Sequence, residues 1–521
     1  MPKPAVFFIP VIILAAIFSY LNSFQNQFVF DDEDFVVRNS TVHDLHNLPH
    51  VFTENMIQGA RKGSNFYRPL QSLTHGVDYI LWKDKPQGHH AFNILFHILA
   101  AIAAYLALKN IFSKEASFLA ALFFAIHPVQ TEAVTYISGR SDPMAGFFIL
   151  LAILLFNKNL VLSCVSFILA VMSKESALIT PALIMLYFCF PTRPKGASRE
   201  LFKKISPFII IAIIYGALRL TVLNFSNTVG ANLPQPFYYV PLYLRFLTFL
   251  KTLPVYFSVL LWPFGLHMER HIDLARSIFE PQVFSGLLIF SAAFFIAFRI
   301  RKMEPANGAM LFGTAWFFTA IFPNSNIIPI NALIYEHWLY LPSLGFFVFI
   351  AWLMEKLIRK GRILKYAAIA LAVITALFYM WRTYERNKEW RDPVSFYESA
   401  IKYTPDSGRL HNNLAMAYSD KARIEDAVRE YKEAIILGDY YPQTHFNLSN
   451  IYIAKGDYEG ALRELKRSVE IDNNFLYAHE SLAVLYYSQK KLYEAKKEAE
   501  FILKTEPWNK TAIGILKKIS E

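Results

Sequence analysis

The sequence predicts an all-α protein, a polytopic transmembrane helical domain followed by an α-solenoid of helical repeats. Its 521 residues are 54% hydrophobic and only 18% charged, which is too apolar for an ordinary soluble chain of this length. Many apolar runs approach the roughly 17–25 residues that a helix needs to cross a bilayer. A 34-residue period near the C-terminus is the third observation behind this prediction.

The apolar runs extend through most of the chain. Residues 1–22 resemble a secretory signal, but the run is long and no clear small-residue cleavage site follows it, so we expect a first transmembrane helix. Cys164 and Cys189 lie in apolar runs, where we expect buried thiols. The runs cover residues 5–22, 91–112, 116–131, 143–157, 159–172, 176–190, 206–223, 241–262, 282–299, 308–323, 337–355 and 365–381.

Basic loops predict the orientation, because Lys and Arg in short loops mark the cytoplasmic side. Three such loops share that side if the N-terminus is cytoplasmic and residues 241–262 do not cross. Arg245, Lys251 and Pro254 favour a re-entrant or interfacial hairpin there, leaving about eleven spans and an external C-terminus. The basic residues are Arg193, Lys195, Arg199, Lys203 and Lys204; then Arg299, Arg301 and Lys302; and finally Lys356, Arg359, Lys360, Arg362 and Lys365.

This orientation divides the chain into three parts. Residues 1–382 form the membrane domain, whose long first loop, residues 31–90, lies outside. Residues 383–406 form a connecting helical segment, and residues 407–521 hold three repeats and a terminal helix on the same external side. That side is the periplasm or extracellular space, or the lumen of the endoplasmic reticulum in a eukaryote. We therefore expect a multi-pass integral membrane protein.

The polar tail contains a repeated pattern. Leu414, Leu448 and Leu482 are spaced by 34 residues, and each is followed by a small residue, a tyrosine and a later alanine at the same period. This is the tetratricopeptide signature. Pro405 and Pro507 bracket the array, where its helices must end. Such arrays form concave surfaces, so we expect repeats 407–508 to bind a protein or peptide; packing on the membrane domain alone is the alternative.

Four carboxylates lie together in FVFDDEDFVVRN, residues 28–39, just after the first apolar run. Unpaired charge is costly in hydrocarbon, so Asp31, Asp32, Glu33 and Asp34 are expected outside the membrane. A carboxylate pair there can act as general base for a hydroxyl nucleophile.

Further polar groups occur at or near membrane depth, where ionisable residues are candidates for a functional site. Some have a structural alternative: Glu132 and Arg140 as an ion pair that holds a loop, and Lys174 and Glu175 as a neighbouring interfacial pair. His97 is expected to be a core histidine, and His43, Asp44 and His46 solvated loop residues. The candidates are Arg68, His127, Glu132, Arg140, Asp142, Lys174, Glu175, Glu336 and His337.

Known motifs exclude several chemistries. HExxH and CxxC spacings are absent from the sequence, so a protein metal site is not expected, and GxxxxGK[ST] and GxSxG are absent as well. Basic groups near the membrane surface can hold a phosphate. Acidic and basic groups together suit a lipid-linked phosphosugar as substrate. Its lipid tail stays in the bilayer, and its phosphate is stabilised as it leaves the sugar. The net charge of +11 fits the cytoplasmic loops, so no nucleic-acid partner is expected.

The chain resembles the multi-membrane-span O-mannosyltransferases with C-terminal tetratricopeptide repeats, a branch of the GT-C class of polyprenyl-phosphate-sugar-dependent transferases. The resemblance covers nearly the whole chain in the same order. It rests on FVFDDEDFVVRN, YRPLQSLTHGVDYIL, HPVQTEAVTYISGRSDPMAG, SKESALITP, YEHWLYLPSLGF and RNKEWRDPVSFY, followed by the repeats.

This resemblance implies an inverting transfer of a sugar, often mannose, from a polyprenyl-phosphate donor to the hydroxyl of an external protein. It implies Asp31 as general base, with Asp32 as the close alternative. Arg140, His127 and Lys174 are implied at the donor phosphate or in support of that site. Glu336 fits the acidic position before LYLPS, while His337 stands where the resemblance leads us to expect arginine. No cofactor beyond the lipid-linked donor is implied.

Two other function classes remain open. One is a non-catalytic membrane scaffold whose repeats recruit envelope or secretory-pathway proteins. The other is a transporter, which predicts internal inverted symmetry. We see no matching halves, and the charges cluster near one face instead of at mid-depth.

Overall fold

The protein is described from a computed structural model that covers residues 5–189, 197–223, 240–300, 308–330 and 332–521. Over these ranges the chain forms helices and loops without strands, which confirms the all-α prediction. Two compact units divide the chain, Met1–Asp392 and Pro393–Glu521. The predicted basic residues Arg193, Lys195, Arg301 and Lys302 lie outside the described residues.

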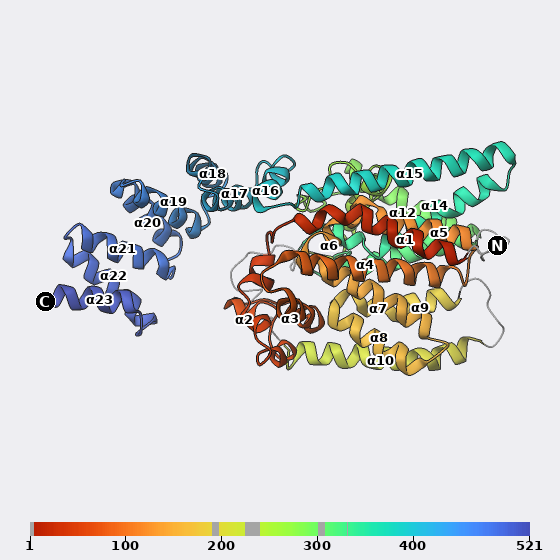
Figure 1. The fold of residues 1–521 in the computed structure, drawn as a ribbon, viewed down its shortest axis with the longest axis horizontal. Coiled ribbons are helices and arrows are strands. Elements are labelled where there is room, and N and C mark those ends of the chain that lie inside the picture. Colours follow the sequence, from red (N-terminus) through yellow and green to blue (C-terminus); the bar gives the residue numbers. More distant parts are fainter. Residues whose placement is uncertain (1–4, 190–196, 224–239, 301–307, 331) are drawn as a thin grey trace. The chain divides into compact units, whose positions relative to one another are not determined.

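Long apolar helices build the first unit. They are α1 (Ala5–Tyr20), α4 (Pro86–Leu108), α5 (Lys114–Ile126), α7 (Ser141–Leu155), α8 (Leu160–Ser173), α9 (Thr180–Cys189), α10 (Ala197–Leu220), α11 (Leu242–Leu261), α12 (Pro281–Ile300), α13 (Gly308–Ile321), α14 (Pro342–Ile358) and α15 (Arg362–Lys388). Helix α1 packs against α4, α5 and α15, and α4 packs against α7 (Figure 1). The shorter α2 (Ser40–His43) and α3 (Pro69–Trp82) lie at the end of this unit opposite the N-terminus (Figure 1).

Local sequence signals begin several of these helices. Ser113 and Asn159 precede α5 and α8, and each side chain accepts a backbone N–H of the first turn. Such a side chain satisfies a donor that the helix itself leaves unpaired. Pro86, Pro281 and Pro342 occupy the first positions of α4, α12 and α14, where the missing N–H is not needed.

The predicted hairpin at residues 241–262 is wrong, because α11 is one continuous helix from Leu242 to Leu261. Pro254 removes only one backbone bond, and the helix continues through it. Both ends of α11 contact loops. Arg245 donates to the Ile327 carbonyl at 2.6 Å, and the Leu260 carbonyl lies 3.2 Å from Nε2 of His127. The prediction that residues 241–262 do not cross the membrane remains untested.

Within the described ranges, six helices are long and apolar enough to cross a membrane, or seven if the bent pair Lys114–Ile126 and Pro128–Val134 is one span. Helices α8 and α9 are apolar but shorter. The count of about eleven spans therefore stays a prediction, while the character of a membrane protein is supported.

The second unit is a helical array. It consists of α16 (Pro393–Ile401), α17 (Gly408–Asp420), α18 (Ile424–Leu437), α19 (Pro442–Ala454), α20 (Tyr458–Ile471), α21 (Leu476–Ser488), α22 (Leu492–Thr505) and α23 (Lys510–Ser520). The periodic leucines and alanines are buried where paired helices meet, which explains why the period is kept. These residues are Leu414, Leu448 and Leu482, and Ala427, Ala461 and Ala495.

The boundary between the units differs from the predicted one. It lies between Asp392 and Pro393 instead of between residues 382 and 383. The predicted connecting segment 383–406 is not a separate element, because its first residues complete α15 and its later residues form α16. Helix α15 continues past its apolar stretch because its polar last turns contact the first unit: the Arg386 and Asn387 side chains are buried there.

A buried histidine–glutamate pair recurs in each repeat. In the second repeat, Nδ1 of His445 lies 2.6 Å from Glu464, and Nε2 lies 2.5 Å from Asp439. The same spacing of 34 gives two further pairs, at 2.7 and 2.5 Å, between α17 and α18 and between α21 and α22. Each pair joins the two helices of one repeat. The other two pairs are His411–Glu430 and His479–Glu498.

The pKa of His445 predicts that the repeats weaken as the pH rises. Although burial lowers it, bonds to Glu464 and Asp439 raise the pKa of His445 above its ordinary 6.5 overall. A raised pKa contributes stability that is present below about pH 6.5 and lost as the pH rises through the folded value. As the pH rises, amide hydrogen exchange in α19 and α20 of the full chain should therefore accelerate, after correction for the intrinsic effect of pH on exchange. Equal pH dependence in His445→Gln would contradict this prediction.

Candidate active site

The acid cluster begins in a closed turn. The Val29 N–H donates to Oδ2 of Asp32 at 3.0 Å, and the Asp32 N–H donates back to the Val29 carbonyl at 3.1 Å. Between them, Phe30 has a φ of +54°, a left-handed conformation that bulky residues rarely adopt. Such strain persists only where surrounding contacts impose it, and it is frequent at functional sites.

Asp32 is fully buried, and its carboxylate accepts three hydrogen bonds. Oδ1 accepts the backbone N–H of Ser138 at 2.8 Å and its hydroxyl at 2.5 Å, while Oδ2 accepts the Val29 N–H. Burial raises the pKa of Asp32 to about 7, against the lowering effect of these donors and with a smaller upward contribution from Asp31. Asp32 thus connects the acid turn to residue 138, over a hundred positions further along the chain.

Asp31 is only half-buried, in contrast to its neighbour. The buried Tyr136 lies near both acids. Burial, and then the charges of Asp31 and Asp32, raise the pKa of its phenol. The last two acids of the cluster form ion pairs at the surface: Glu33 with Arg38 at 2.7 Å, and Asp34 with Lys62 at 2.7 Å. The geometry therefore separates Asp31 and Asp32 from the other two acids.

The segment from Ser138 to Asp142 brings the predicted residues together. It forms a short 3₁₀ turn and the start of α7. Successive side chains of this segment reach different elements. Its contacts are Ser138 with Asp32, Arg140 with Asp78 and Asn93, Ser141 with Arg68, and Asp142 with Lys174.

Arg140 is completely buried and its donors are used within the protein. It is ion-paired with Asp78, and Nε donates to Asn93 at 2.6 Å. Nη2 also donates to the His89 carbonyl at 2.9 Å, and Nη1 to Thr74 at 3.2 Å. These contacts hold Arg140 within the protein, and this geometry suits a supporting role.

Two cation–carboxylate pairs lie at the end of this segment. Lys174 donates to both carboxylate oxygens of Asp142 at 2.7 Å. Arg68 makes a two-pronged contact with Glu175, at 3.1 and 2.9 Å. Lys174 has an extended backbone, so its side chain and that of Glu175 point apart, and each has a different partner instead of the neighbouring pair that was the structural alternative. The Glu175 side chain is 44% exposed, whereas Arg68 is only 12% exposed.

Glu132 connects this region to the loop before α14. Oε2 accepts the backbone N–H groups of Glu336 and His337 at 3.0 and 3.2 Å, and Oε1 lies 2.7 Å from Nδ1 of His337. The alternative in which Glu132 pairs with Arg140 is therefore absent from the described contacts. The charges of Lys174, Asp142 and Arg68 also act on His337, so these side chains lie in one neighbourhood.

Glu336 is buried between two arginines that the sequence analysis did not single out. Oε1 accepts from Arg270 at 2.9 Å, and Oε2 lies 3.5 Å from Arg386. Arg386 belongs to the quoted RNKEW motif, which could have revealed it; Arg270 had no comparable signal. His337 stands where arginine was expected, and the two guanidinium groups contact the residue before it, Glu336.

His127 does not join the cluster. Its Nδ1 accepts the Val129 N–H at 3.1 Å, and Nε2 contacts the Leu260 carbonyl. The ring packs edge-on against Tyr379 with centroids 4.4 Å apart. His97 is buried, as expected, between the Tyr340 hydroxyl and the Ala125 carbonyl.

Asn93 and Asn387 are further residues that sequence reasoning missed. The Asn93 amide donates to the carbonyls of Val134, Tyr136 and Ile137 and so fixes the backbone that leads into Ser138. Asn387 accepts from Thr135 at 2.7 Å and donates to the Ser19 carbonyl, joining α15, α1 and the same backbone. A lone asparagine in an apolar or charged run gave no signal of this role.

Known proteins resemble this chain in sequence. A protein O-mannosyl-transferase of Caenorhabditis elegans is 28% identical over 446 residues, covering 83% of this chain and 63% of that protein. The protein O-mannosyl-transferase TMTC3 of Homo sapiens is 25% identical over 456 residues, covering 80% and 50%. The predicted resemblance is thereby confirmed, and the chain spans about half to two thirds of the length of these curated relatives.

Two further comparisons concern the repeats and the fold. Models described as TPR repeat and tetratricopeptide repeat match residues 449–490 and 408–435, which confirms the repeat prediction. Among solved structures, the crystal structure of the Archaeoglobus fulgidus oligosaccharyltransferase is 15% identical, covering 74% of this chain and 56% of that chain with a TM-score of 0.40.

The raised pKa of Asp32 predicts a local pH dependence. Since its folded pKa of about 7 exceeds the ordinary value of 3.8, stability should rise as the pH falls from about 7 toward 4, and be lost as the pH rises again. Hydrogen exchange in residues 26–38, corrected for its intrinsic pH effect, should slow over this range. Asp32→Asn should remove the effect and Asp34→Asn should keep it; an unchanged profile in Asp32→Asn would refute the assignment.

Proposed function

We propose that this chain is a membrane glycosyltransferase that moves a sugar, mannose or another hexose, from a polyprenyl-phosphate donor to a hydroxyl of a protein acceptor. The observation that carries the proposal is that the turn with Asp31 and Asp32 and the cations Arg68 and Lys174 all meet the Ser138–Asp142 segment. The identity with named protein O-mannosyl-transferases over four fifths of the chain supports the same function.

Asp31 is the proposed general base, because it is the half-buried acid while Asp32 is enclosed by donors. Asp31 takes the proton of the acceptor hydroxyl as its oxygen attacks the anomeric carbon. The bond from that carbon to the phosphate oxygen breaks, and the polyprenyl phosphate leaves with the electron pair. Attack opposite the leaving group inverts the anomeric centre. Asp32 is a positioning residue that holds the turn carrying Asp31.

Arg68 and Lys174 are the proposed groups for the donor phosphate. Glu175 already presents two oxygens to the guanidinium fork of Arg68, as a phosphate would. Because the Glu175 side chain is 44% exposed, a phosphate can replace it without leaving a deeply buried carboxylate unpaired. Lys174 lies near Arg68, because the charges of both residues act on His337. A phosphate's charge is stabilised there as it departs.

The proposed orientation follows the basic loops, with a cytoplasmic N-terminus and the acid loop on the exterior side. A polyprenyl tail in the bilayer then delivers its phosphate to the membrane surface near this loop. The repeats lie on the same side in this proposal and capture the protein acceptor, a role that repeat arrays commonly have.

Asp31→Asn should abolish most transfer while the protein stays folded. Removing a general base costs about 10²- to 10⁴-fold in rate. Purified full-length chain in lipid nanodiscs is given polyprenyl-phosphate mannose and a mixture of secreted proteins, and labelled sugar in protein is counted. Glu33→Asn, in the same cluster, is the matched control and should retain activity. Full transfer by Asp31→Asn would contradict its role as base, and absence of transfer by the parent chain would favour a scaffold.

Arg68→Lys should weaken use of the lipid donor, because lysine keeps the charge but loses the planar fork. We expect the KM for polyprenyl-phosphate mannose to rise about tenfold, with a smaller change in kcat. Arg38→Lys, which alters an exposed pair with Glu33, is the matched control. An unchanged KM in Arg68→Lys would remove Arg68 from the phosphate site.

A further inference from the structure

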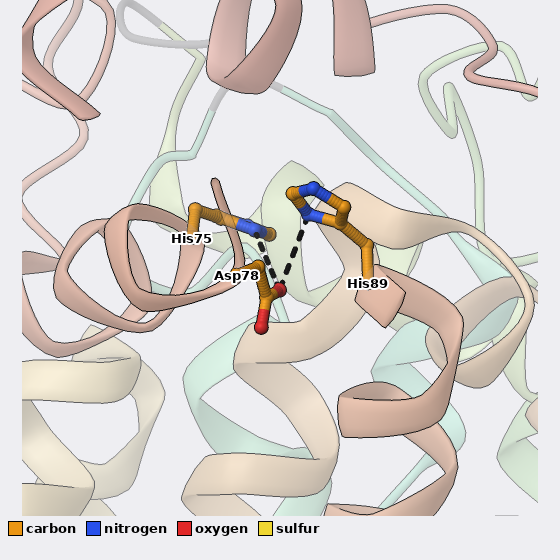
Figure 2. A group of neighbouring side chains, drawn as sticks. All are labelled: His75, Asp78 and His89. Carbon is orange, nitrogen blue, oxygen red and sulfur yellow. Dashed lines mark ion pairs between the residues drawn. The ribbon is translucent and has the colours of Figure 1, made fainter. Parts of the chain in front are cut away.

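The geometry points to a Zn²⁺ site formed by His75, Asp78 and His89 (Figure 2). Helix α3 supplies His75 and Asp78 from one face, three residues apart, and the first turn of α4 supplies His89. All three side chains are fully buried. In Figure 2 both imidazole rings direct a nitrogen toward the same carboxylate.

The distances bring three potential ligand atoms to one point. Nδ1 of His89 lies 3.2 Å from Oδ2 of Asp78, and Nδ1 of His75 lies 4.0 Å from the same oxygen. All three ligand atoms lie within 4.8 Å of one another. Zinc holds nitrogen and oxygen ligands at about 2.0–2.2 Å, so neighbouring ligands in a tetrahedron are about 3.3 Å apart. A modest movement of the His75 ring completes this arrangement.

The same atoms need a partner. In the described part of the chain, Nδ1 of His75 and Oδ1 of Asp78 are buried without a hydrogen-bond partner, and Nδ1 of His89 has only the Asp78 carboxylate beside it. Buried polar atoms left unpaired cost free energy, and each such group in a native structure calls for an explanation. A cation bound between the rings and the carboxylate satisfies all three atoms together.

The donor set selects the kind of metal. Two imidazoles and one carboxylate suit Zn²⁺, whereas Ca²⁺ and Mg²⁺ bind mainly through oxygen ligands and retained water. Arg140 is ion-paired with Oδ2 of Asp78, the oxygen that also faces the two rings, and this pair fixes the orientation of the carboxylate. The positive charge of Arg140 opposes the metal, and the nearby negative charge of Asp32, which acts on Arg140, offsets part of that opposition.

The proposed metal site contacts two parts of the candidate active site, the Ser138 backbone and the start of the acid turn. Gln71, on α3, donates to the Ser138 carbonyl at 2.7 Å, and Phe28 packs edge-on against the His89 ring with centroids 5.3 Å apart. A bound Zn²⁺ would therefore join α3 to α4 next to the segment that leads into the acid turn. The sequence analysis expected no metal because the familiar spacings are absent, and a pair at i and i+3 with a distant histidine is too common to signal a site.

Metal content of the full-length chain tests this inference directly. The protein is purified in detergent without a histidine tag, stripped with a chelator, incubated with ZnCl₂ and desalted, and its metals are counted by mass spectrometry. We expect about one Zn²⁺ per chain, and its loss in the double variant His75→Ala/His89→Ala. His46→Ala is the matched control, because it removes an exposed histidine that pairs with Asp44 and should keep the metal.

Thermal unfolding of the unmodified chain makes the test independent of how the variants fold. Zinc added to the stripped protein should raise its Tm, whereas Mg²⁺ should not, because a ligand that binds only the folded state stabilises it. Two results would overturn the inference: a parent chain with neither bound zinc nor a zinc-dependent Tm, or equal zinc in the parent and the double variant, which would mean adventitious binding.

Discussion

The contacts of the short segment from Ser138 to Asp142 decide how the candidate site is built. Within this segment, four side chains reach partners on the first loop, on α3 and α4, and on the turn after α8. These parts are far apart in the sequence, and the segment contacts all of them. The contacts are Ser138 to Asp32, Arg140 to Asp78, Ser141 to Arg68, and Asp142 to Lys174.

Pairing is the physical reason why so many charges can lie buried there. A buried ion that loses its partner costs several kcal/mol, so each carboxylate in the cluster is matched by donors. Asp32 accepts three donors, and Glu132 accepts two backbone N–H groups as well as contacting His337. Such satisfied networks hold side chains in one geometry, which a transfer reaction requires of its acid and its phosphate ligands.

The sequence could predict what depends on local pattern. Apolar runs and the 34-residue period identified the helices and the repeats, because burial of Leu414 and its equivalents is imposed within each helix pair. The gathering of the polar motifs was also predictable, since ionisable groups near a membrane are confined to its faces or to protein interior.

Partner choice could not be predicted, because it depends on tertiary geometry. Lys174 and Glu175 are adjacent, yet an extended backbone turns them toward Asp142 and Arg68. The two arginines around Glu336 likewise come from distant parts of the chain, one from the loop before α12 and one from α15, and the asparagine that holds the backbone before Ser138 comes from α4. The hairpin predicted at residues 241–262 rested on the sidedness of the basic loops together with Arg245, Lys251 and Pro254, and none of these features excludes a continuous helix such as α11.

A double-mutant cycle between Asp31 and Ser138 tests the central claim, that the segment acts through the acid turn. Sugar transfer is measured for the parent chain, Asp31→Asn, Ser138→Ala and the double variant. If Ser138 serves only to position Asp31 through Asp32, Ser138→Ala should slow the parent chain about tenfold or more and have little effect once Asp31 is gone. Equal effects of Ser138→Ala in both backgrounds would contradict the account.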